Sequence, residues 1–275
     1  MFDNIFAAIE KWMRELLTGM VESNMSTMFT DVNEKTSEIA AQVGRTPQNW
    51  NSSVFSMIQN LSESVVVPIA GIIITLVLCY ELISMLTERN NLHDVDTWMF
   101  FKYFVKAWVA IYLVSNTFTI TMAVFDVGQS VVNSASGIIN GETAIDVSSL
   151  SMQMQAAMAT MEIGELVVLA LETFLVSFCM KIMSVVITVI VYGRMIEIYL
   201  YTSLAPIPFA TMSNREWGHV GTNYFRGLFA LAFQAFLMMV CVAIYAALIS
   251  SVRISSNMHS ALIGVAAYTV ILCFS

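Results

Sequence analysis

The strongest constraint on the fold of this chain is a series of apolar runs, each close to the length of a membrane-spanning helix. A helix of about 20 residues crosses the roughly 30 Å hydrocarbon core of a bilayer. The predicted spans cover residues 65–86, 99–124, 165–191, 227–250 and 258–275. The last run is still apolar where the sequence stops, so we expect the natural chain to extend beyond Ser275.

Composition supports the same fold class. The 275 residues are 57% hydrophobic and only 12% charged, whereas soluble domains carry about 25% charged residues. A soluble fold could not cover so much apolar surface with so few charges. We therefore predict an all-α, polytopic transmembrane protein with five full spans. The net charge of −8 and the lack of a basic cluster argue against sequence-specific DNA binding.

Residues 1–64 are expected to form an extracytoplasmic region that precedes the transmembrane domain, residues 65–275. Apolar residues recur with helical spacing over 2–20, with charges on the opposite face. This pattern predicts an amphipathic helix that either lies on the bilayer surface or packs against a partner helix. Asp3 and Glu10 interrupt the apolar residues, so no cleavable signal peptide is predicted. Residues 22–64 predict a polar helical segment with a turn near Gly44 and Pro47.

Lysine and arginine positions predict the orientation. No Lys or Arg occurs between residues 107 and 180, whereas Arg89, Lys102 and Lys106 flank the first predicted loop. Cytoplasmic loops are enriched in these residues. We therefore expect loop 125–164 and the amino terminus to be extracytoplasmic. Within that loop, residues 133–164 predict an irregular stretch followed by a helix.

The apolar piece 195–212 contains Pro206 and Pro208, which interrupt helical hydrogen bonding. If the piece crosses the membrane, the protein has six spans, and Arg215 and Arg226 lie outside. If it bends back, both arginines stay with Arg194 on the cytoplasmic side. The positive-inside tendency favours the bent segment.

One predicted span carries a stripe of polar residues at steps of three or four. Its members are Thr173, Ser177, Lys181, Ser184 and Thr188. A lysine that faces lipid costs several kcal/mol, so the stripe should face protein or water. It is a candidate channel lining or, alternatively, a polar contact between packed helices. Glu172 lies on the other side of the helix from Lys181 and needs a partner elsewhere.

Arg194 and Glu197 are three residues apart and form a candidate ion pair at the membrane boundary. No metalloprotease, nucleophile-elbow or P-loop motif is present. The three histidines are far apart and lie at predicted span ends. We therefore predict no cofactor, no metal site and no enzymatic activity.

The run RMIEIYLYTSLAPIPFATM over residues 194–212 is followed by SNREWG and NYFRGLFALAFQAFLMMVCVAIY. This block resembles the TrbL-like, VirB-type conjugal transfer membrane proteins of Gram-positive integrative elements, most closely over residues 193–245. The matching positions are Arg194, Glu197, Pro206, Pro208 and Trp217, for which the resemblance implies an architectural role.

The resemblance implies a cytoplasmic-membrane (inner-membrane) subunit of a conjugative type IV secretion system. Such a subunit would help single-stranded DNA or protein to cross the membrane. It would form a homo-oligomeric ring, a pentamer, beside other conjugation subunits that include ATPases. The low positive charge fits a passive conduit, because a pore that binds phosphate tightly would stall transport. Two other classes stay open: a small-solute transporter built on broken helices, and a non-conducting scaffold.

Overall fold

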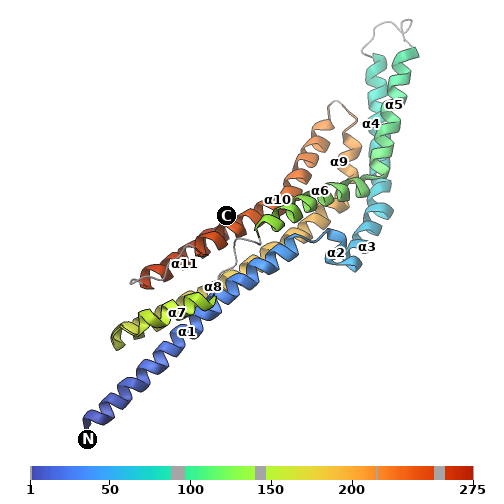
Figure 1. The fold of residues 1–275 in the computed structure, drawn as a ribbon. Helices are drawn as coiled ribbons and strands as arrows, with labels where there is room; N and C mark the ends of the chain where they lie inside the picture. The colour runs from blue at the N-terminus through green and yellow to red at the C-terminus, as the bar shows by residue number, and fades with distance from the viewer. Residues whose placement is uncertain (1, 88–96, 140–146, 215, 251–257, 275) are drawn as a thin grey trace. The chain divides into compact units, whose positions relative to one another are not determined.

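The computed structural model describes residues 2–87, 97–139, 147–214, 216–250 and 258–274 (Figure 1). All the elements in these residues are helices, which confirms the predicted all-α fold. The first are α1 (Phe2–Val43), α2 (Pro47–Trp50), α3 (Ser52–Leu61), the π-helical segment η1 (Ser62–Val66) and α4 (Val67–Thr87). They are followed by α5 (Thr97–Ser115), α6 (Thr117–Ile139), α7 (Val147–Met158), α8 (Ile163–Leu204), α9 (Pro206–Thr211), α10 (Gly218–Ser250) and α11 (Met258–Phe274).

Within the described residues, four helical stretches are long and apolar enough to cross a membrane. They are Ser52–Thr87, Thr97–Ser115, Ile163–Leu204 and Gly218–Ile249. A shorter apolar helix, His259–Ile271, corresponds to the last predicted span. In the most apolar part of Ile163–Leu204, only 11% of the residues are buried. Apolar side chains that point outward over such a length are favourable in lipid and costly in water.

The first predicted span begins earlier than the apolar run indicated. Helices α3 and α4 are continuous through η1, so Pro68 lies inside a long helix rather than at its start. A proline inside a helix removes one amide donor and crowds the preceding turn. The π-helical segment directly before Pro68 is one of the distortions that relieve such crowding.

The second predicted span, 99–124, is two helices rather than one. The break falls at Asn116, whose Nδ2 donates to the Tyr112 carbonyl at 2.9 Å. The Thr117 hydroxyl donates to the Leu113 carbonyl at 2.8 Å. Side chains that compete in this way for helix carbonyls bend helices.

The predicted loop 125–164 is more helical than expected. Helix α6 continues to Ile139, so the irregular stretch predicted from residue 133 is wrong over 133–139. Residues 140–146 lie outside the described part of the chain. Helix α7 follows and corresponds to the helix predicted at the end of this loop.

The predicted span 165–191 and the piece 195–212 are joined in one helix. Helix α8 has 42 residues, which makes it about 63 Å long at 1.5 Å per residue. The expected gap near residue 193 is absent, because a single glycine costs a helix only about 1 kcal/mol. The helix is interrupted at Ala205 instead. Pro206 has no N–H to offer the Thr202 carbonyl, and the Ala205 N–H donates to that carbonyl at 3.3 Å.

The chain reverses direction over residues 212–217, after the prolines. Asn214 shapes this turn, because its Oδ1 accepts the N–H groups of Glu216 at 2.7 Å and Trp217 at 3.1 Å. Helix α10 then returns beside the end of α8, where the rings of Tyr201 and Tyr224 stack at 4.6 Å. The proline-bent segment is therefore one arm of a helical hairpin.

The described chain forms two compact units. The first comprises residues 1–44, 133–192 and 237–275, and the second comprises residues 45–132 and 193–236. Helices α6, α8 and α10 contribute residues to both units.

The core of the first unit joins α1, α7, α8, α10 and α11. Its buried residues include Met25, Phe29, Met154, Met158, Leu166, Leu169, Tyr245, Ile249, Leu262 and Val265. Polar contacts also connect α1 to α7 and to the residues that follow α7. The Arg14 guanidinium donates to the Met161 carbonyl at 2.7 Å, and Glu22 accepts from Ser151 at 3.0 Å and Gln155 at 2.8 Å.

The predicted amphipathic helix is the first half of α1, which extends to Val43 and ends at the predicted turn. Residues from Val21 onward pack into the core, whereas the apolar face before them is exposed. Its exposed members are Ile5, Phe6, Ile9, Trp12, Met13, Leu16 and Met20.

Among the described residues, the second unit has three groups of buried apolar side chains, of which the smallest is Ile58, Phe118 and Tyr199. Helices α4, α5 and α9 share Ala70, Ile74, Leu78, Ala110, Val114, Phe209 and Ala210. Helices α6, α8 and α10 share Phe125, Met195, Ile198, Leu228, Leu231 and Ala232. In the second group, Gly128 of α6 lies directly against the backbone of α10.

We predict that Gly128→Ala destabilises the second unit. A Cβ at position 128 would lie 2.8 Å from the Ala232 carbonyl oxygen, so the two helices would have to move apart. Overpacking of this kind costs about 1–3 kcal/mol. Gly71→Ala is the matched control, because a Cβ there has no atom within 4 Å. Thermal unfolding in detergent should show a lower midpoint for Gly128→Ala only; equal midpoints would contradict the close approach.

Candidate functional site

The predicted polar stripe of α8 lies partly against α1. Thr173 is fully buried, and its Oγ1 accepts a hydrogen bond from Asn24 Nδ2 at 3.4 Å. The Ser177 hydroxyl donates to the Asn24 carbonyl at 3.4 Å. Farther along α8, the half-buried Thr188 donates to the Ser184 carbonyl at 2.9 Å and lies near Gln42 of α1. Within one chain, these residues contribute to a polar contact between packed helices.

Lys181 differs from the other members of the stripe because it is exposed. Around it, Phe178, Ile182 and Val185 are exposed apolar side chains. In the described part of the chain, no carboxylate lies within 4 Å of the lysine ammonium group. An unpaired ammonium in such a setting is costly in lipid. A channel-lining role stays a prediction, and it now depends mainly on Lys181.

Glu172 has a partner that the sequence did not identify. Its Oε2 lies 2.5 Å from Nδ1 of His259, at the start of α11. The two side chains are 35% and 39% exposed. The residues are 87 positions apart, so helical spacing could not relate them. The sequence analysis had predicted only that His259 lies at a span end.

Arg194 is buried at 7% exposure, and its Nε has no hydrogen-bond partner among the described residues. Glu197, one turn along α8, is exposed and attracts the guanidinium electrostatically. Pro206 is buried and begins α9, and Pro208 is half-buried within it. These four predicted residues lie along one arm of the α8–α10 hairpin rather than around a common cavity.

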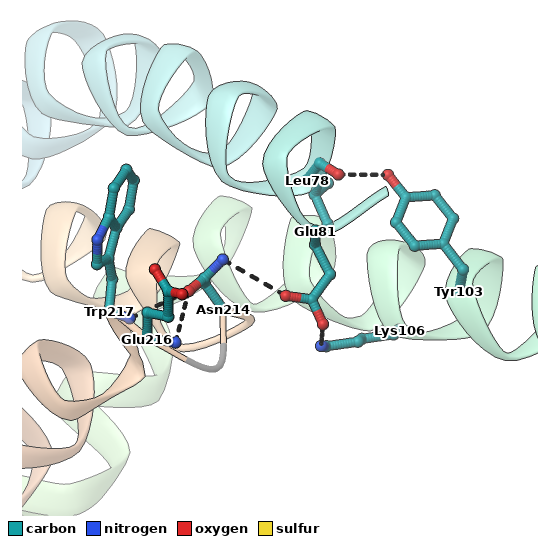
Figure 2. Close-up of polar contacts among 7 residues, drawn as sticks. All are labelled: Leu78, Glu81, Tyr103, Lys106, Asn214, Glu216 and Trp217. Atoms are coloured by element: carbon teal, nitrogen blue, oxygen red, sulfur yellow. Dashed lines mark hydrogen bonds and ion pairs between the residues drawn. The ribbon is translucent and has the colours of Figure 1, made fainter. Parts of the chain in front are cut away.

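A polar cluster that the sequence did not predict connects α4, α5 and the turn before α10 (Figure 2). We call it the Glu81 cluster; its members are Tyr80, Glu81, Tyr103, Lys106, Asn214, Glu216 and Trp217. Glu81 lies between the other two segments. One carboxylate oxygen is 2.5 Å from Lys106 Nζ, and the other accepts from Asn214 Nδ2 at 3.4 Å.

Further contacts reinforce these three segments. The Tyr103 hydroxyl donates to the Leu78 carbonyl at 2.9 Å, which joins α5 to α4. The Tyr80 hydroxyl donates to Glu216 at 3.0 Å. The rings of Tyr80 and Trp217 stack with their centroids 5.9 Å apart. The turn before α10 is therefore attached to α4 by a carboxylate, a phenol and a ring stack.

The ion pair between Glu81 and Lys106 could have been predicted from the charges of these two residues. Both lie inside predicted spans, and charged residues within spans usually pair with one another. Because the two spans are consecutive, an α4–α5 pair was the simplest arrangement. The contribution of Asn214 could not be inferred, since nothing in the spacing brings residue 214 near residue 81.

The Glu81 cluster borders a cleft of about 300 Å³. Its lining residues are Tyr80, Glu81, Ser84, Met85, Met99, Lys102, Tyr103, Lys106, Asn214 and Glu216. Elsewhere, no group of three or more histidine, cysteine or acidic side chains is placed to hold a metal, as far as the described residues extend. The cleft offers charged and aromatic groups for binding.

We predict that Lys106→Met weakens the attachment of α4 to α5 and to the following turn. The substitution leaves the Glu81 carboxylate without its ammonium partner, and a hydrogen bond to a charged group contributes about 1.5–3 kcal/mol. Lys102→Met removes the same charge one turn away, where the ammonium lies over the Trp98 ring at 5.7 Å and has no carboxylate of the described residues within 4 Å. Thermal unfolding and protease sensitivity of the 212–217 turn should change for Lys106→Met alone. Equal effects from both variants would argue against the ion pair.

Comparison with known proteins places these features in a family. A family model described as TrbL/VirB6 plasmid conjugal transfer like protein matches residues 32–206. The match covers more than half of the chain, and it includes Glu81, Lys106 and the whole polar stripe. The block 193–245, on which the sequence resemblance was based, shares only residues 193–206 with this match. No curated protein and no solved structure matches the chain.

The predicted resemblance is therefore confirmed, although on a longer stretch that lies closer to the amino terminus. The matched region contains, in full, three of the four helical stretches of the described residues that are long enough to cross a membrane. The chain belongs to the TrbL/VirB6 plasmid conjugal transfer-like family of multi-pass membrane proteins.

Proposed function

We propose that this protein is a cytoplasmic-membrane channel or scaffold subunit of a conjugative type IV secretion system. In this role it assists the transfer of single-stranded DNA or protein across the membrane. The observation that carries the proposal is the family match over residues 32–206, which covers most of the membrane-spanning helices. Energy for transfer would come from ATPase subunits of the same machine, and a Gram-positive host is part of the proposal.

The proposed orientation has the amino-terminal region and residues 125–164 outside the cytoplasm. Contacts of Glu22 with Ser151 and Gln155 support a common side for these two regions. The contact between Glu81 and Asn214 supports a common side for the α4–α5 ends and the 212–217 turn. The lysines near the first loop favour the cytoplasm for this second side.

Assembly into a homo-oligomeric ring, with five subunits as the first expectation, is part of the proposal. Lys181 supports it, because an exposed ammonium on an apolar helix needs water or a partner charge from outside the chain. In a ring, α8 could turn Lys181 toward a hydrated axis. Low overall positive charge suits passage of a polyanion, which must not be held tightly.

A non-conducting scaffold is the second candidate. The exposed apolar face of α1 between Ile5 and Met20 favours it, since such a face can bind a partner helix. A small-solute transporter has less support, because only one proline-interrupted hairpin is present in the described chain and no inverted repeat accompanies it.

Particle mass and symmetry of the protein in nanodiscs test the proposed assembly. We expect a closed ring, with α8 facing the axis. A monomer that stays a monomer when partner subunits are added would argue against the ring and favour the transporter or scaffold.

We also predict that deletion of the gene abolishes conjugation and that Lys181→Leu lowers transfer about tenfold or more, since a charge-lined path loses its polar group. Lys181→Arg should retain transfer. Lys11→Leu is the matched control, because Lys11 is exposed on α1. Mating frequency is the readout, with membrane levels of each variant measured in parallel. Full transfer by Lys181→Leu at a normal level would contradict the channel-lining role.

A further inference from the structure

The cleft beside the Glu81 cluster is a polar site toward the adjoining ends of α4 and α5. Exposed apolar side chains continue away from it along these helices at Ile72, Leu76 and Trp108, and Ile83 and Phe101 beside it are exposed too. Next to the cleft, aromatic rings with polar edges gather at Tyr80, Trp98, Tyr103 and Trp217. Tryptophan and tyrosine concentrate at the level of lipid headgroups. Such rings beside a long apolar surface are what a cleft at headgroup depth would present.

The charges that line the cleft are only partly neutralised by one another. Glu81 and Lys106 form an ion pair at 2.5 Å. Lys102 contacts the Trp98 ring, and no carboxylate of the described residues lies within 4 Å of its ammonium. Glu216 accepts from the Tyr80 hydroxyl, and a carboxylate can accept several more hydrogen bonds. Among the described residues, one cation and one anion on different segments of the cleft thus have no ion-pair partner within 4 Å.

The opposite charges of Lys102 and Glu216 suit a ligand that carries both a phosphate and a primary ammonium. We propose that the cleft binds the headgroup of phosphatidylethanolamine, with the phosphate toward Lys102 and the ammonium toward Glu216. Ser84, which also lines the cleft, supplies a further hydroxyl donor. Met85 and Met99 supply an apolar wall for the start of the acyl chains. The volume of about 300 Å³ is at the small end of ligand sites, as a headgroup requires.

A lipid bound in the cleft would contact the ends of α4 and α5 and also the turn before α10, and so would hold them together at the protein surface. The side-chain contacts of the Glu81 cluster already connect these three segments within the protein. The site requires both signs of charge, so it should discriminate among lipids of similar size. Phosphatidylglycerol lacks the ammonium, and phosphatidylcholine has a quaternary ammonium that cannot donate a hydrogen bond to a carboxylate. This inference is independent of a role in conjugation, because lipid binding is measured on the purified chain.

The test is lipid retention by the full chain in detergent, measured by native mass spectrometry after addition of each lipid. We expect one phosphatidylethanolamine to be retained in preference to phosphatidylglycerol and phosphatidylcholine. Lys102→Gln and Glu216→Gln should each weaken its binding about tenfold, equivalent to about 1.4 kcal/mol. Lys102→Arg should retain binding and shows that loss does not reflect misfolding.

Lys11→Gln and Glu15→Gln are matched controls, because they remove the same charges from an exposed pair on α1. They should leave phosphatidylethanolamine binding unchanged. Equal binding of the three lipids, or equal losses in the controls, would overturn the proposal. Complete competition by glycerophosphoethanolamine at equal concentration would assign the site to a soluble phosphate ester and overturn the lipid assignment.

Discussion

In a bilayer, backbone N–H and C=O groups find no water, so they must be satisfied inside the chain. This constraint accounts for the helical fold and for the way in which the helices are interrupted. The break at Ala205 follows from Pro206, which deprives the Thr202 carbonyl of its usual donor; the Ala205 N–H takes that place. Before Pro68, a π-helical turn keeps the chain helical instead of ending it. Pro206 therefore ends one apolar helix with its last carbonyl satisfied, whereas the turn before Pro68 keeps another helix continuous.

The same medium makes unpaired charges costly, and the charges inside the spans illustrate three outcomes. Glu81 is paired with Lys106 on the next helix, and Glu172 is paired with His259 on a helix far along the chain. Lys181 has no carboxylate beside it in the described residues and faces outward. The first two charges stabilise contacts within one chain. The third is placed to interact with something outside the chain, and for this reason it is central to the proposed function.

The sequence predicted the approximate positions of the apolar helices, because apolar length is a local property. It failed where side chains compete with the backbone, as at Asn116, where one predicted span became two helices. It also placed a gap near Gly193 that the structure lacks, because one weak helix former does not end a helix. The polar stripe was recognised from its spacing, but its contact with Asn24 depends on a helix that begins more than a hundred residues earlier.

Apolar runs, proline positions and the near absence of charge determined by themselves that this chain is a multi-pass helical membrane protein. These properties are decided residue by residue, through the transfer of side chains into lipid and the hydrogen bonding of the adjacent backbone. Only the tertiary structure decided which polar groups meet. It joined Glu81 to Asn214 across 133 positions and placed Lys102 and Glu216 on one cleft. Such contacts depend on which helices become neighbours, and that is set by packing between distant segments, which leaves no periodic signal in the sequence.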